Sequence, residues 1–316
     1  MTATGPQDFP GRPDSARHDL ERDGAERDET KRPGVGRNDG HSPAAPDQFA
    51  TSDHTVSPGD AREDPDDLAE ARARGELTLL YQPEFDLRRG TFVGVEALLR
   101  WRHPTRGLLG PRDFADALVA PDVAVAVGRW VLAEATRQGA RWHDRGHRFA
   151  VALNVSRGQV TSPTFVDDVA SALRAHALAP AALTLELATT TLENLDDPRR
   201  AALLALGVRL GVDDVVPGVT NVDDLIARGV GVVKLARGAV SDRSRDAALA
   251  AMLATLATRD VRVVAAGVES PVTARRLEGA TDLAVEGQGF LYARPLPASA
   301  IDELLADFAI FSGEPL

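Results

Sequence analysis

The feature that most constrains the fold is an alternation of short apolar runs with longer amphipathic stretches over roughly 250 residues, the usual size of a (β/α)8 barrel. The runs are rich in Val and Leu, and helical patterns separate most of them. Near-continuous apolar strands joined through helices are typical of a parallel sheet covered on both faces, and eight such units favour closure into a barrel. The predicted strands are residues 77–82, 92–99, 149–155, 183–187, 208–212, 231–235, 261–265 and 283–285.

The connections between the runs refine this prediction. The clearest helical patterns cover residues 113–120, 123–145, 165–175, 222–227 and 246–258. The first two strands, in contrast, are joined only by the turn-rich segment 86–90, which suits a hairpin. We therefore predict an α/β fold of the (β/α)8, TIM-like barrel type, in which one strand runs antiparallel to the others.

The N-terminal segment has a different composition. In residues 1–66 the large apolar side chains, such as Phe9, Leu20 and Phe49, are isolated among Asp, Glu, Arg, Pro and Gly. Such a segment cannot bury enough apolar surface to offset its conformational entropy. We therefore predict a disordered tail over residues 1–66, followed by a barrel domain over residues 67–316.

Composition excludes several classes of function. The chain has no cysteine, which rules out disulfide scaffolds, zinc-thiolate sites, iron–sulfur clusters and thiol nucleophiles. Its 36 basic and 47 acidic side chains give a net charge of −11, which argues against binding to a nucleic-acid polymer. There is no run of about 18 apolar residues and no apolar signal-peptide core. We therefore expect a cytoplasmic protein without membrane insertion.

Polar residues interrupt or end most of the apolar runs. Seven of them occupy matching positions near the carboxyl ends of successive predicted strands: Glu96, Asn154, Glu186, Asp213, Asp214, Lys234 and Gln288. Carboxylates inside apolar strands are costly unless they are paired or bind a metal. The carboxyl ends of barrel strands meet at one mouth, where such groups could share a ligand. Carboxylate and amide oxygens without Cys or His form a hard donor set that suits Mg²⁺ or Mn²⁺.

Each of these residues also has a simpler interpretation. Asp213 and Asp214 could begin a loop and cap the next helix. Lys234 could extend from a strand edge towards water, and Gln288 could lie in a Gly-Gln-Gly turn. Their joint occurrence at matching positions on successive strands favours a shared site.

Several motifs show a resemblance to a known family. Residues 96–100 read Glu-Ala-Leu-Leu-Arg and are followed by Trp-Arg-His-Pro at 101–104. Tyr-Gln-Pro at 81–83 and Arg-Pro-Leu-Pro at 294–297 flank the rest of the domain. With these motifs, residues 77–312 resemble an EAL domain, the bacterial phosphodiesterase module that opens cyclic di-GMP to its linear dinucleotide.

The resemblance implies a role for each candidate residue. A first cation, Mg²⁺ or Mn²⁺, would be held by four residues: Glu96, Asn154, Glu186 and Asp213. Asp213 would also bridge to a second cation, with Asp214 beside it. Lys234 would help to position the attacking water, and Gln288 would orient groups near the phosphate. Cyclic di-GMP would be contacted by three further residues: Gln82, Leu98 and Arg100.

The chain also departs from the family pattern. Ala266 stands where active members carry the first glutamate of Ala-Glu-Gly-Val-Glu, and Ala236 replaces the aspartate of Lys-x-Asp. Thr189 replaces the second glutamate of Glu-x-Thr-Glu, which anchors the loop after the paired aspartates. Pro217 requires that loop, residues 213–220, to take a different shape. Loss of an acid–base group typically lowers a rate by about 10²–10⁴-fold.

These departures leave three hypotheses. In the first, the domain binds cyclic di-GMP through a divalent cation, with impaired or absent hydrolysis. In the second, another acid such as Asp214 compensates, and the domain is an active phosphodiesterase that yields linear pGpG. In the third, the barrel is an interaction module that binds a second copy of itself or a signalling protein and leaves the pocket empty.

Overall fold

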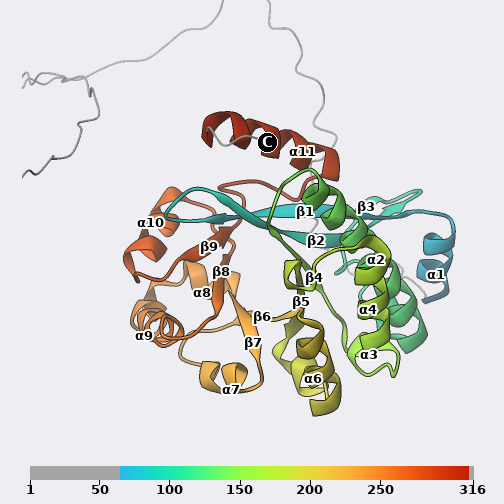
Figure 1. Ribbon diagram of the computed structural model, residues 1–316, viewed down its shortest axis with the longest axis horizontal. Coiled ribbons are helices and arrows are strands. Elements are labelled where there is room, and N and C mark those ends of the chain that lie inside the picture. Colours follow the sequence, from blue (N-terminus) through green and yellow to red (C-terminus); the bar gives the residue numbers. More distant parts are fainter. Residues whose placement is uncertain (1–64, 313–316) are drawn as a thin grey trace, which may run out of the picture. The chain divides into compact units, whose positions relative to one another are not determined.

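The computed structural model describes residues 65–312 (Figure 1), so residues 1–64 of the tail predicted for residues 1–66 lie outside the described part of the chain. The described chain begins with helix α1 (Pro65–Ala73), two residues before the predicted domain boundary at residue 67. Leu68 and Ala71 of this helix are fully buried. Helix α1 is therefore packed as part of the barrel domain.

Eight strands close into a barrel, which confirms the predicted TIM-like fold (Figure 1). In chain order they are β1 (Leu77–Asp86), β2 (Phe92–His103), β4 (Ala150–Asn154), β5 (Leu183–Ala188), β6 (Arg209–Val215), β7 (Val230–Leu235), β8 (Arg262–Ala266) and β9 (Val285–Gln288). Around the barrel their order is β1-β9-β8-β7-β6-β5-β4-β2, and pairing of β2 with β1 closes it. A short strand, β3 (Gly107–Leu109), extends β2 as an antiparallel hairpin.

Strand β1 is the predicted antiparallel strand. It runs against both of its neighbours, β2 and β9, whereas the other barrel pairs are parallel. The hairpin turn to β2 is held by Asp86, whose Oδ1 accepts hydrogen bonds from the backbone N–H groups of Arg88 at 2.9 Å and Arg89 at 2.8 Å. Gly90 completes the turn with φ +65°, a conformation that favours glycine.

Helices surround the barrel and cover its outer face (Figure 1). They are α2 (Pro121–Asp144), α3 (Arg157–Val160), α4 (Phe165–His176), α5 (Thr189–Glu193), α6 (Asp197–Leu206), α7 (Val222–Ala227), α8 (Arg237–Ser241), α9 (Asp246–Leu256), α10 (Pro271–Gly279) and α11 (Ala298–Ser312). Short 3₁₀ turns lie at η1 (Ala117–Val119), η2 (Pro180–Ala182) and η3 (Arg243–Arg245). Helix α11 packs over β1.

One predicted helix is wrong. Residues 113–120 contain only the turn η1, not an α-helix. Ala120 precedes Pro121 and takes an extended backbone with φ −65° and ψ 120°, because the proline ring disfavours helical geometry at the preceding residue. The Asp113 carboxylate instead accepts a hydrogen bond from the N–H of Gly110 at 2.7 Å, which stabilises the loop.

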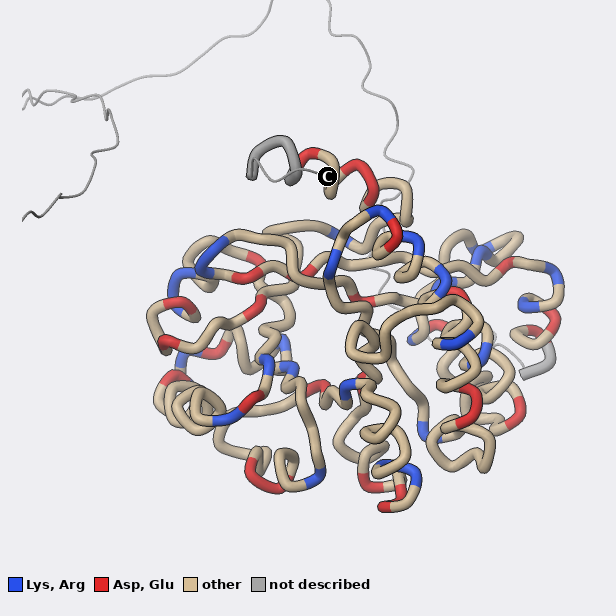
Figure 2. Tube along the Cα trace, viewed as in Figure 1, with Lys and Arg blue, Asp and Glu red and all other residues tan. Residues whose placement is uncertain are grey.

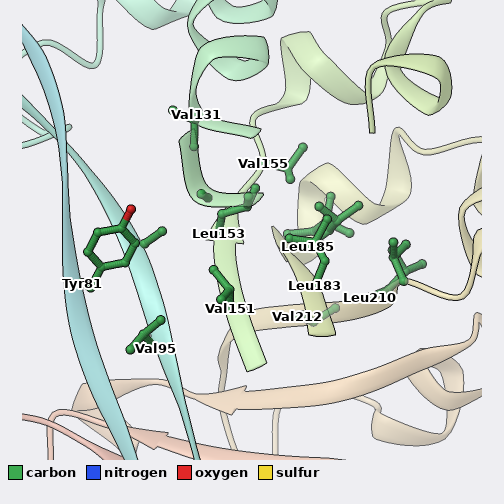
Figure 3. Close-up of a cluster of buried hydrophobic side chains, with 14 of the residues drawn as sticks. Tyr81, Val95, Val131, Val151, Leu153, Val155, Leu183, Leu185, Leu210 and Val212 are labelled. Carbon is green, nitrogen blue, oxygen red and sulfur yellow. The ribbon is translucent and has the colours of Figure 1, made fainter. Parts of the chain in front are cut away.

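Alternation along each strand separates two environments. Val151 and Leu153 of β4 and Leu183 and Leu185 of β5 belong to the hydrophobic core that includes the surrounding helices (Figure 3). Because successive side chains point to opposite faces of a strand, the residues between them, such as Glu186, point into the barrel. Most of the apolar core thus lies between the barrel and its helices, and inside the barrel polar side chains such as Lys234 lie beside Val232 and Val264.

Charges on the helices are mixed. Acidic and basic residues alternate over the outer elements, and the view in Figure 2 has no face of a single sign. Within the described residues, no helix has the length and apolar character required to cross a membrane.

Candidate functional site

Glu96 is the centre of a buried polar cluster inside the barrel. It lies in β2 and accepts three side-chain hydrogen bonds: from Asn154 Nδ2 to Oε1 at 2.5 Å, and from Lys234 Nζ at 2.7 Å and Gln288 Nε2 at 2.8 Å to Oε2. Burial acts to raise the pKa of Glu96, but the charge of Lys234 and these hydrogen bonds outweigh it and lower the pKa. Glu96 is therefore held as a carboxylate, and side chains from β2, β4, β7 and β9 meet on it.

Lys234 is the cation of this cluster. Its ammonium, on β7, donates to Glu96 and also to Glu186 Oε2 at 2.9 Å, and its side chain is only 3% exposed. Burial acts to lower the pKa of Lys234, but Glu186, Glu96 and Asp213 together raise it well above the usual value. The ammonium thus stays protonated and neutralises part of the negative charge around it.

Glu186, on β5, has far less support than Glu96. Its Oε1 is buried and has no hydrogen-bond partner in the described part of the chain. Burial raises the pKa of Glu186 to about 8, although Lys234 opposes the shift. Both glutamates bind the same ammonium, and the difference arises because Glu96 accepts three hydrogen bonds whereas Glu186 accepts one. Glu186 therefore keeps its proton to a higher pH than Glu96 does.

Asp213 and Asp214 lie at an irregularity of β6. The pairing of β6 with β7 shifts between Val212 and Val215, so that the two aspartates fall in a bulge. Asp214 is exposed and has φ +57°, and its backbone N–H donates to Asp213 Oδ1 at 2.7 Å. Asp213 is partly buried, and burial raises its pKa against the opposing charge of Lys234. The bulge thus directs two adjacent carboxylates towards the same mouth of the barrel.

The residues predicted to touch a dinucleotide lie beside this cluster. Gln82, paired with Glu96 across the β1–β2 ladder, donates from Nε2 to the carbonyl of Ala293 at 3.2 Å. Leu98 and Arg100 follow Glu96 on the same face of β2 and are partly buried. The guanidinium of Arg100 donates to the carbonyl of Leu99 at 2.8 Å, and burial lowers its pKa against the opposing charges of Glu96 and Asp113.

Comparison with known proteins identifies the family of the chain. The profile described as "EAL domain" matches residues 66–295 of the chain. The chain belongs to the EAL domain family.

Relatives of this EAL domain include cyclic di-GMP enzymes. The bifunctional diguanylate cyclase/cyclic di-GMP phosphodiesterase MucR of Pseudomonas aeruginosa is 36% identical over 252 residues, which cover 77% of this chain and 36% of that protein. The cyclic di-GMP phosphodiesterase NbdA of the same organism is 34% identical over 260 residues, which cover 79% and 33%. The chain therefore spans about a third of the length of these two relatives.

Solved structures give the same result. A structure described as the PaMucR phosphodiesterase in complex with c-di-GMP has a TM-score of 0.69 and 34% identity, and the match covers 75% of this chain and 98% of that chain. The EAL enzyme Bd1971, in a form with bound cAMP and cyclic di-GMP, has a TM-score of 0.70 and 25% identity, with 76% and 67% covered. Both solved structures thus share the fold of this EAL domain.

The EAL positions that lack an acid lie next to the cluster. Ala266, at the end of β8, pairs with Gln288 of β9, and Gln288 donates directly to Glu96. Ala236 follows β7, and Thr189 begins α5 just after β5. The three positions at which we predicted a missing acid therefore lie at, or directly after, the ends of three strands, β5, β7 and β8.

Sequence reasoning missed one buried carboxylate of this EAL barrel. Glu84 of β1 is 2% exposed, and its Oε1 has no hydrogen-bond partner among residues 65–312. Its Oε2 lies 3.7 Å from Arg262, which also pairs with Glu286. Burial raises the pKa of Glu84 to about 7, and the charges of Lys234 and Arg262 oppose the shift. Alternation from Gln82 was the available signal, because residues 82 and 84 share the inner face of β1.

The cluster fits a divalent cation in composition but not in its present arrangement. EAL phosphodiesterases depend on divalent metals. The orphaned Oε1 of Glu186 and the all-oxygen donor set suit a hard cation. Among residues 65–312, however, no three His, Asp or Glu side chains are placed to hold a metal ion. Lys234 occupies the space between Glu96 and Glu186, and Asn154 presents its amide nitrogen rather than its oxygen.

Proposed function

We propose that this EAL domain binds cyclic di-GMP through a divalent cation, Mg²⁺ or Mn²⁺, and hydrolyses it slowly or not at all. The observation that carries the proposal is the retained cluster of Glu96, Asn154, Glu186 and Lys234 beside Ala266. The donors needed to hold a cation and a phosphodiester are present, and the adjacent acid is replaced by a methyl group.

The binding part of the proposal rests on a buried carboxyl oxygen that lacks a partner in the described part of the chain. Glu96, Asn154, Glu186 and Asp213 would supply oxygen ligands, and the partnerless Glu186 Oε1 would gain a partner from the cation. Arg100 would direct its partly desolvated guanidinium towards a phosphate, which would offset the desolvation that lowers its pKa. Gln82 and Leu98 lie on the same side of the mouth and would contact the ribose or base of the ligand.

The proposal of slow or absent hydrolysis rests on which side chains could accept a proton from the attacking water. A bound divalent cation would supply charge stabilisation on the phosphate oxygens and would favour ionisation of water. Lys234 stays protonated between two carboxylates, so it can orient groups but cannot accept a proton. At position 266 the chain has no side chain that could take a proton from the attacking water. Without that group we expect a rate about 10²–10⁴-fold below that of a complete site.

Two features favour the alternative of an active phosphodiesterase. Two of the relatives that match this chain, MucR and NbdA, have names that include cyclic di-GMP phosphodiesterase. Asp214 is exposed at the mouth in a left-handed backbone conformation, which presents its carboxylate next to Asp213. In that case Asp214 would serve as the base, and Asp214→Asn would abolish turnover.

Calorimetry and product analysis on the full chain separate these functions. Titration of cyclic di-GMP in the presence of Mg²⁺ is expected to give saturable heat, and Glu96→Gln should weaken binding roughly tenfold or more. The exposed Glu303→Gln change, far from the cluster on α11, is the matched control. Chromatography of the same mixtures should find little linear dinucleotide. The absence of heat at about 100 μM ligand would favour the interaction module, and rapid product formation would favour the active enzyme.

A further inference from the structure

A second group of charged side chains lies inside the barrel, at the end opposite the mouth. Because β1 runs antiparallel to its neighbours, its last residues lie at the same end as the first residues of β8 and β9. Three side chains from these strands meet there and form the floor triad: Glu84, Arg262 and Glu286. The Glu84 side chain is 2% exposed, whereas that of Arg262 is 22% exposed. The floor triad therefore combines a deeply buried carboxyl with an arginine that water can reach.

The strands around Glu84 leave room for its carboxyl. The pairing of β1 with β2 shifts between Glu84 and Phe85, an irregularity of the kind that redirects side chains. Gly94 lies opposite Glu84 on β2, and a Cβ at Gly94 would come within 2.7 Å of Glu84 Oε2 and 3.2 Å of the Ala150 carbonyl oxygen. A larger residue at position 94 would therefore displace the carboxyl, so the glycine is required by the buried position of Glu84.

Arg262 lies between two carboxyl groups but forms hydrogen bonds with only one of them. Its Nε donates to Glu286 Oε1 at 2.8 Å and its Nη2 donates to Glu286 Oε2, which gives a bidentate pair. The same Nη2 lies 3.7 Å from Glu84 Oε2, too far for a hydrogen bond. Glu84 Oε1 also has no hydrogen-bond partner in the region that the structure describes. A movement of the guanidinium by about 1 Å would bring Nη2 within hydrogen-bond distance of Glu84.

The charges that act on Glu84 come from five strands. Besides Arg262 on β8 and Glu286 on β9, they are Lys234 on β7, Glu96 on β2 and Glu186 on β5. Burial raises the pKa of Glu84 to about 7, against the opposing charges of Lys234 and Arg262. Burial acts to lower the pKa of Lys234, and Glu84 is one of the carboxyls that raise it. A proton gained or lost by Glu84 therefore changes the charge that acts on the cluster at the mouth.

We propose that the floor triad is a proton-controlled switch in which Arg262 changes its carboxyl partners. When Glu84 carries a proton, the guanidinium pairs with Glu286 alone. When the Glu84 O–H bond breaks and the proton passes to water, the ionised Oε2 accepts a hydrogen bond from Arg262 Nη2, and the guanidinium bridges both carboxylates. Strand β9 carries Glu286 and also Gln288, which donates to Glu96, so the exchange acts on a strand that contacts the mouth cluster. The switch requires no bound ligand and is independent of the proposed function.

Carbon NMR of the full chain with isotope-labelled glutamate carboxyls, titrated with pH in EDTA, tests the switch. The resonance that is missing from Glu84→Gln belongs to Glu84, and we expect it to titrate near pH 7. Glu286→Gln removes a negative charge and frees the guanidinium to pair with Glu84, so the midpoint should fall by about one pH unit. Arg262→Met should raise the midpoint by a similar amount, about one pH unit. The matched control is Arg209→Met, at an exposed arginine that begins β6, and it should leave the midpoint unchanged.

The double change Arg262→Met with Glu286→Gln separates partner exchange from simple repulsion. Without the guanidinium, loss of the Glu286 charge should lower the Glu84 midpoint by much less than it does in the chain that keeps Arg262. An equal fall in both backgrounds would overturn the switch, because repulsion alone would then explain it.

Crystal structures of the unmodified chain at pH 5.5 and pH 8.5 test the movement itself. The distance from Arg262 Nη2 to Glu84 Oε2 should stay near 3.7 Å at the lower pH and shorten to about 2.8 Å at the higher pH. An unchanged distance, a Glu84 midpoint below pH 5, or no fall of the midpoint in Glu286→Gln would each overturn the switch. If circular dichroism shows that Arg262→Met does not fold, the Glu286→Gln titration and the two crystal structures decide.

Discussion

We expect replacement of Lys234 by methionine to lower the stability of the barrel, because its ammonium contacts both Glu96 and Glu186. Lys234→Met keeps most of the side-chain volume and removes the charge that lies 2.7 Å from Glu96 and 2.9 Å from Glu186. Removing one partner of a buried ion pair leaves the other charge unpaired and costs about 3–5 kcal/mol. In a domain of this size, 1 kcal/mol shifts the midpoint of thermal unfolding by about 2–4 °C. We therefore expect the midpoint to fall by about 10 °C in the metal-free chain.

Circular dichroism of the full chain near neutral pH, with EDTA or with excess Mg²⁺, measures this effect. Mg²⁺ should stabilise Lys234→Met more than the unmodified chain, because the cation replaces the missing charge between Glu96 and Glu186. The double change Lys234→Met with Glu186→Gln should recover part of the loss in EDTA, because it removes one of the two acidic groups that lose their partner with the ammonium. The control Arg228→Met breaks an exposed pair with Asp224 and should change stability by less than about 1 kcal/mol.

A clear result would refute the reasoning. If Lys234→Met unfolds at the same temperature as the Arg228→Met control in EDTA, Lys234 is not the counter-ion of the cluster. If the double change is less stable than Lys234→Met alone, charge imbalance is not the cause of the loss.

Two further predictions concern pH and the missing acids. The pKa values of Glu84 and Glu186, about 7 and about 8, lie above the ordinary value of 4.5, so the folded chain holds protons that the unfolded chain has released. Stability of the metal-free chain should therefore fall as pH rises from about 5 to 8, by about 1 kcal/mol per pH unit for each group; urea unfolding at pH 6 and pH 8 measures it, and a rise in stability would contradict it. Restoring acids by Ala266→Glu together with Ala236→Asp and Thr189→Glu should raise metal-dependent formation of the linear dinucleotide at least tenfold, whereas Ala266→Gln should not. If cyclic di-GMP still binds to the triple variant and product formation does not rise, the defect lies elsewhere.

The barrel could be predicted from the sequence because alternation and apolar runs report directly on burial. The hairpin of β1 and β2 was predictable from its turn residues, and Gly90 at the end of the turn has a positive φ. Helices α3, α5 and α8 have only four or five residues, too few to show a helical period. Helices α6 and α10 are longer, and their caps at Asp196 and Ser270, each followed closely by proline, were a usable signal that the apolar pattern did not reveal.

The site could be predicted only in part. Strand position was enough to place Glu96, Lys234 and Gln288 at one end of the barrel, and the structure brings them into direct contact. The contacts of Lys234 with Glu96 and Glu186 were not predictable, because the spacing of residues along the chain does not report which side chains of different strands meet. Glu84 was overlooked for a related reason: it directly follows the Tyr-Gln-Pro segment at residues 81–83, and its nearest cation, Arg262, comes from a strand far along the chain.

The seam between β1 and β9 has a consequence for how the chain reaches its native state. β1 meets β9 through only two residue pairs, Phe85 with Gly287 and Asp86 with Glu286, and these partners are separated by about 200 residues of sequence. During synthesis the edge of β1 that pairs with β9 stays unpaired until β9, the last strand, has left the ribosome. A chain cut short before residue 285 would keep two open sheet edges, and we expect such fragments to associate with one another rather than to fold.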